Sequence, residues 1–85
     1  MAEVIVGLKV LPKDISVNLD ELEGKIKKAI SPNSMEREPV AFGLVAIHIV
    51  KFVPDAGGQV EEIENKLKAI EEVGEIEITG ISRGL

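Results

Sequence analysis

The two halves of this 85-residue sequence match each other at one fixed offset of 41 positions, which carries position 19 onto position 60. Each half holds an alternating apolar stretch, typical of a strand, and a stretch with apolar residues every three or four positions, typical of an amphipathic helix. The offset aligns both patterns without a gap, so a repeated strand–helix–strand unit is the strongest constraint on the fold. The aligned pairs are Val4–Val45, Val6–Ile47, Leu8–Ile49, Leu19–Val60, Leu22–Ile63, Ile26–Leu67, Glu21–Glu62, Glu23–Glu64, Lys25–Lys66 and Lys27–Lys68.

Turn and capping residues divide the chain into its elements. Asn18 is a good N-cap for a first helix, and Gly74 is interpreted as the end of the second. The stretch from Met35 to Val40 is rich in charge and suits an edge strand, whereas the β-branched stretch 42–53 suits a central strand. The predicted elements are a strand over 3–11, a helix from Asn18 to 30, strands over 35–40 and 42–53, a helix over 59–72, a strand over 75–79 and a short tail over 81–85.

A duplicated strand–helix–strand unit with right-handed crossovers gives an α+β, ferredoxin-like βαββαβ sandwich. Two helices are expected on one face of a four-stranded antiparallel sheet, with the first and third strands in the middle. The other face is expected to lie open, as a surface for a partner or a ligand. The short chain leaves room for one domain, so residues 1–85 are predicted to form a single domain.

The composition excludes several function classes. The chain has 15 acidic against 10 basic residues, a net charge of −5 that disfavours nonspecific binding to nucleic-acid phosphates. Phe42 and Phe52 are its only aromatic residues, too few for a base-stacking platform. The absence of cysteine rules out disulfides, thiolate metal sites and cysteine catalysis. We therefore expect no direct contact with nucleic acid.

No targeting or membrane segment is predicted. The N-terminal residues combine Glu3 and Lys9 with apolar positions and lack the basic, apolar and small-residue regions of a leader. The longest stretch without Asp, Glu, Lys or Arg, from Pro39 to Val50, is too short to span a bilayer. We expect a cytoplasmic protein without membrane contact.

The polar residues form no recognisable catalytic set. His48 is the only histidine, and the offset that pairs it with Gly7 places it on the open face as a half-exposed residue. The aspartates have neither the spacing of a calcium loop nor that of paired catalytic carboxylates. Gly57-Gly58 lacks the companion residues of a phosphate loop. We predict no catalytic residue, no metal and no cofactor, and hence not an enzyme.

Two segments are not accounted for by the repeated strand–helix–strand unit. Phe42, before Gly43, is interpreted either as core filler, the slightly favoured alternative, or as an aromatic anchor presented to a partner from a turn. In the tail, Arg83 lies two places before the C-terminal Leu85. Its charge serves either solubility or insertion into a pocket of a partner.

The segment Glu38-Pro39-Val40-Ala41-Phe42-Gly43-Leu44 resembles the guanine-nucleotide exchange domains of the translation elongation factor 1-beta family, in their short archaeal-type form. The resemblance covers nearly the whole chain, from the Leu19-Asp20-Glu21-Leu22 helix start to the closing 75–79 strand. It implies nucleotide exchange on GDP-bound elongation factor 1-alpha, a GTPase, with no cofactor.

The resemblance also implies which residues bind the partner. Phe42 of the Phe-Gly motif, beside Gly43, belongs to the surface that contacts the partner in the family. In the tail, Arg83 and Leu85 are further candidates for this contact. The chain departs from eukaryotic relatives, whose penultimate residue is a lysine that acts near the partner's magnesium site: Gly84 stands there, and Arg83 is the nearest base. Those relatives also carry two lysines where this chain has Val45 and Ala46.

Two other classes share the order of elements. An ACT-like module that senses small molecules is the main alternative, but such modules carry glycine in the loop after the first strand. The third class, an acylphosphatase-like enzyme, needs arginine in a phosphate loop. The corresponding loop, from Leu11 to Ser16, has neither glycine nor arginine.

Overall fold

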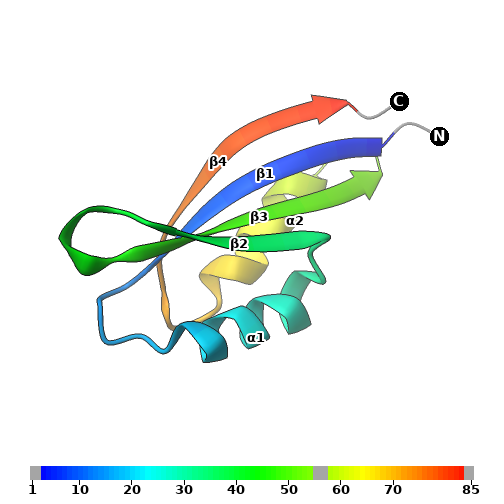
Figure 1. The fold of residues 1–85 in the computed structure, drawn as a ribbon. Coiled ribbons are helices and arrows are strands. Elements are labelled where there is room, and N and C mark those ends of the chain that lie inside the picture. Colours follow the sequence, from blue (N-terminus) through cyan, green and yellow to red (C-terminus); the bar gives the residue numbers. More distant parts are fainter. Residues whose placement is uncertain (1–2, 55–57, 84–85) are drawn as a thin grey trace.

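The computed structural model describes residues 3–54 and 58–83. Its four strands form one antiparallel sheet in the order β2-β3-β1-β4, and both helices cover the same face (Figure 1). The ferredoxin-like prediction is confirmed, with the first and third strands in the middle. The elements are β1 (Glu3–Pro12), α1 (Leu19–Ile30), β2 (Ser34–Pro39), a 3₁₀ turn (Ala41–Gly43), β3 (Val45–Pro54), α2 (Gln59–Lys68) and β4 (Val73–Arg83).

The core lies between the sheet and the two helices, as the alternation and the helical stripes predict. Alternate residues of β1 are buried, while their neighbours face the open side of the sheet. Each fully buried Leu or Ile contributes about 1.5–3 kcal/mol, so this cluster supplies most of the driving force. The core residues are Val4, Val6, Leu8, Val10, Leu22, Ile26, Ile30, Ile47, Ile49, Val53, Ile63 and Leu67.

Both helices are short and amphipathic. The Asn18 side chain accepts a hydrogen bond of 3.1 Å from the Glu21 N–H, which confirms Asn18 as the N-cap of α1. At the other end, Ser31 adopts a left-handed conformation, and its N–H donates to the Lys27 carbonyl. Within the described residues, neither helix is long and apolar enough to cross a membrane.

Three predicted boundaries are wrong. Phe42 and Gly43 lie in the 3₁₀ turn, so the central strand begins at Val45 and not at position 42. The other two boundaries lie after α2. This helix ends at Lys68, and β4 runs from Val73 to Arg83, so residues 81–83 belong to a strand and not to a tail. The reason lies in packing between distant segments. A Cβ at Gly74 would lie 2.7 Å from the Lys13 α-carbon, so glycine there permits close approach of β4 to the end of β1 and does not cap the helix.

The molecule is elongated, measuring 42 × 22 × 17 Å. The hairpin of β2 and β3 projects from one end, while β1 begins and β4 ends at the other (Figure 1). Because β2 is an edge strand, it is bonded to the sheet through β3 alone. The tip of the hairpin is therefore presented away from the core.

Candidate partner-binding site

The tip of the β2–β3 hairpin is a tight turn closed by backbone hydrogen bonds. The Val40 N–H donates to the Leu44 carbonyl at 2.9 Å, and the Leu44 N–H donates to the Ala41 carbonyl at 3.3 Å. Between them, Phe42 and Gly43 both have left-handed backbones, with φ of 63° and 77°. Glycine adopts this conformation freely, but Phe42 holds it at a cost of about 1–2 kcal/mol. Strain of this kind gathers at functional sites.

The side chain of Phe42 is 93% exposed, so the core alternative for this residue is wrong. The turn lies at the projecting end of the hairpin, and the core is filled by aliphatic residues of β1, β3 and the helices. The other aromatic residue, Phe52, is 41% exposed on the open face of the sheet. A large apolar side chain held almost wholly in solvent has the form of an anchor for a protein partner.

The loop between β1 and α1 lies beside the turn. It presents Ile15, which is 72% exposed, and together with Gly43, Leu44 and Val45 of the hairpin it lines a cavity of about 160 Å³. Hydrogen bonds from Ser16 stabilise the loop and lower the pKa of the Asp14 carboxyl. Sequence reasoning missed Ile15. The available signal was a large apolar residue, Ile15, between the polar residues Asp14 and Ser16 of a loop.

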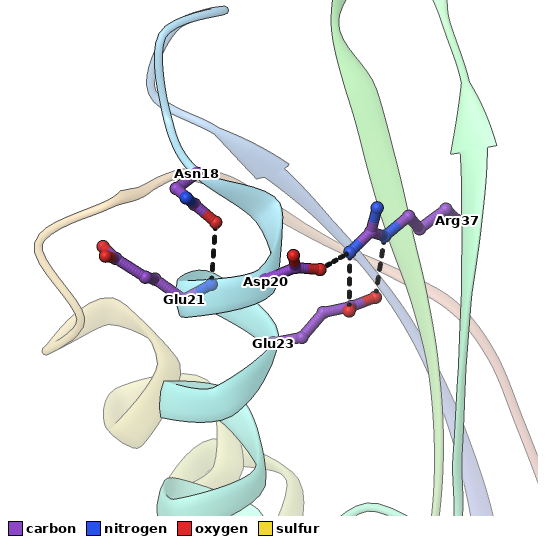
Figure 2. A network of polar contacts seen from close by, with 5 residues as sticks. All are labelled: Asn18, Asp20, Glu21, Glu23 and Arg37. Atoms are coloured by element: carbon purple, nitrogen blue, oxygen red, sulfur yellow. Dashed lines mark hydrogen bonds and ion pairs between the residues drawn. The ribbon is translucent and has the colours of Figure 1, made fainter.

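An arginine of β2 links the hairpin to α1 (Figure 2). The Arg37 guanidinium donates to both carboxylate oxygens of Glu23, at 3.1 and 2.9 Å, and to Asp20 at 2.6 Å. The hydrogen bond to Glu23, then that to Asp20, raises the pKa of Arg37 further above its ordinary range. Helical spacing would also allow Glu23 to pair with Lys27 and Lys25 with Glu21 inside α1. In the structure Glu23 binds Arg37 and Lys25 binds Glu72, so both side chains bind residues of other segments.

The open face carries His48, as predicted. Its Nε2 lies 2.9 Å from a carboxylate oxygen of Glu38, and across the sheet it pairs with Lys9. The histidine is half-buried on the same side of the sheet as Gly7. Within residues 3–54 and 58–83, no three His, Asp or Glu side chains gather into a group that could hold a metal ion.

The structure does not bring the predicted site residues together. Arg83 ends β4 opposite Val4, and Val4 in turn pairs with Val53. The Phe42 turn adjoins Val45, and the eight residue steps from Val45 to Val53 span about 26 Å along β3. Phe42 and Gly43 therefore lie at one end of the sheet and Arg83 at the other. Leu85 lies outside the described residues.

Residues 5–83 match the family described as the EF-1 guanine nucleotide exchange domain. Among curated relatives, the elongation factor 1-beta of Staphylothermus marinus is 40% identical, and 98% of each chain is covered. That of Methanothermobacter thermautotrophicus is 37% identical over the same share. The protein of the same name from Pyrococcus abyssi is 44% identical, with 93% of each chain covered.

Proposed function

Because the chain belongs to the family of EF-1 guanine nucleotide exchange domains, we propose that it promotes the exchange of GDP for GTP on elongation factor 1-alpha. A GTPase holds its nucleotide largely through phosphate and magnesium contacts. A protein that binds the nucleotide-free form more tightly weakens nucleotide binding by the same factor, typically by about 1–3 kcal/mol. This linkage needs no catalytic side chain, so the protein acts as a binding partner and not as an enzyme.

Phe42 is the anchor of this interaction. Its exposure of 93% in a turn with a left-handed backbone is the observation that supports the assignment most directly. Burial of such a side chain in a partner's pocket removes a large apolar area from water, which is how aromatic hot spots stabilise complexes. Gly43 completes the turn, because its φ of 77° favours glycine.

The C-terminal segment supplies a second contact in this proposal. Arg83 and Leu85 are assigned to it, at the end of the sheet opposite Phe42. A partner that touches both ends must span most of the 42 Å long axis. The protein recognises the GDP-bound form, acts in the cytoplasm as one domain over residues 1–85, and requires no cofactor, nucleic acid or membrane.

The experiment is release of a fluorescent GDP analogue from purified elongation factor 1-alpha, with excess GTP and substoichiometric amounts of this protein. We expect release to accelerate with protein concentration, with each molecule acting repeatedly. An equal mass of a non-binding acidic protein serves as the control for charge. Release that stays at the intrinsic rate, with a GTPase shown to bind and hydrolyse GTP, would refute the proposed function.

A further inference from the structure

The outer part of the β2–β3 hairpin, beyond the pair of Arg37 with Ile47, depends on few contacts for its angle, because β3 is paired with β1 only from Ile47 to Pro54. Its outer strand, β2, is bonded only to β3, and its residues are exposed except for Met35, which is partly buried against the core. A two-stranded ribbon twists and bends readily unless its faces are packed. The direction in which the tip points therefore depends on what ties β2 to the helix layer.

Arg37 makes such a connection. It pairs with Ile47 in the ladder, on the face that the helices cover, and lies five residues before Phe42. From there its guanidinium reaches the first turns of α1, where it binds Glu23 and Asp20 (Figure 2). These contacts join segments 14 and 17 residues apart in the chain. We call Arg37, Glu23 and Asp20 together the clamp.

The clamp has more hydrogen bonds and a less exposed acceptor than an ordinary surface ion pair. Single exposed pairs contribute little because two mobile side chains must be ordered in a medium of high dielectric constant. Here one guanidinium makes a two-point contact with Glu23, whose side chain is only 23% exposed, and a third bond to Asp20. Two-point arginine–carboxylate pairs are strong and directional. The receiving helix is itself fixed, since Asn18 caps it and its stripe is buried.

We propose that Arg37 is a positioning residue for nucleotide exchange, which holds the hairpin at the angle that presents Phe42 to the GTPase. This inference rests on the proposed function and adds to it a residue that need not touch the partner. A turn already held in its binding orientation loses less conformational freedom on association. Loss of the clamp should therefore weaken recognition of the GTPase and leave the maximal rate of GDP release unchanged.

The first test needs no partner. Amide hydrogen exchange at the Val40 and Leu44 N–H groups reports opening of the turn, because both donate hydrogen bonds within it. We expect Arg37→Gln and Glu23→Gln each to speed this exchange by about three- to tenfold. Lys66→Gln is the matched control, since it removes the 3.3 Å pair with Glu62 on α2 and the same charge as Arg37→Gln. Unchanged protection in both clamp variants would overturn the proposal.

The second test separates positioning from direct contact. Arg37→Gln and Glu23→Gln change the net charge in opposite directions, so charge steering would move their affinities oppositely. The clamp predicts that both raise the protein concentration for half-maximal GDP release by about three- to tenfold, at an unchanged maximal rate, with Arg37→Lys intermediate. In a Phe42→Ala background the Arg37→Gln effect should largely vanish.

The outcomes distinguish this inference from the proposed function. An effect of Arg37→Gln that Glu23→Gln does not share would mean that Arg37 contacts the partner directly, and the positioning role would be wrong. A fall in the maximal rate with unchanged half-maximal concentration would also contradict it. If the wild-type protein fails to accelerate GDP release, the proposed function fails, but the amide exchange measurement still decides whether the clamp holds the hairpin.

Discussion

Gly43 lies against Ile15, so close that a Cβ atom at position 43 would be 3.7 Å from the Ile15 Cγ2 atom. That distance is an ordinary van der Waals contact. Space alone would therefore admit a methyl group at position 43. The need for glycine comes instead from the backbone, whose φ of 77° is disfavoured for other residues.

Gly43→Ala should lower the free energy of unfolding by about 1 kcal/mol through backbone strain, and weaken exchange because the turn shifts. Denaturant unfolding and GDP release measure the two effects. Gly24→Ala is the matched control, since a Cβ at that exposed position of α1 meets nothing within 4 Å. It should raise stability by about 0.5–1 kcal/mol. A Gly43→Ala protein as stable and active as the wild type would contradict this account of the turn.

Substitutions of Phe42 should affect stability and exchange activity in different ways. Phe42→Gly removes both the side chain and the strain, so it should be more stable than Phe42→Ala by roughly 0.5 kcal/mol or more, although glycine gains freedom in the unfolded chain. Thermal unfolding measures this difference. Both variants should lose exchange activity alike, because both lack the ring. A large loss of stability in both variants would show instead that the Phe42 side chain stabilises the fold.

Arg83→Ala should slow GDP release while leaving the melting temperature within a few degrees of the wild type. The strand pairing of Arg83 with Val4 uses backbone groups, which the substitution keeps. Lys28→Ala, which removes an exposed positive charge from α1, is the control for net charge. Equal exchange rates for Arg83→Ala and the control would remove the C-terminal segment from the site.

His48→Ala should be nearly silent in both stability and exchange. The imidazole is half-exposed, and its contact with Glu38 is a single pair on the open face. Such exposed contacts contribute about 0–1 kcal/mol. The change is measured by denaturant unfolding and by the GDP release assay. A rate loss of tenfold or more would show that the open face takes part in exchange.

The layers and the core could be predicted because they depend on local periodicity. Alternation in β1 and the stripes of α1 and α2 identify the buried residues whichever way the chain turns. The boundary after α2 could not be predicted from local sequence. Glycine is required at position 74 because the chain there approaches Lys13, sixty-one positions earlier in the sequence. The extension of β4 to Arg83 likewise follows from the length of β1, whose partners reach Val4.

The site was less predictable than the fold. The exposure of Phe42 depends on how far the hairpin extends past the helices, a quantity that local sequence does not encode. Arg37 also finds its partners in space, and it takes Glu23 away from the pair with Lys27 that helical spacing suggests. The order of elements alone is equally compatible with an ACT-like module. The Phe-Gly segment, and not the fold, distinguished the exchange family from it.

The central claim is that the Phe42 turn binds the GTPase. It is tested most directly by titrating nucleotide-free elongation factor 1-alpha with wild-type protein, Phe42→Ala and Phe52→Ala, and measuring the dissociation constants. Phe52→Ala removes the same group from the open face, where the side chain is 41% exposed. We predict that Phe42→Ala weakens binding by about thirtyfold or more, the effect of a hot-spot residue, while Phe52→Ala stays within about threefold of the wild type. Equal affinities for the wild type and a folded Phe42→Ala protein would contradict the claim.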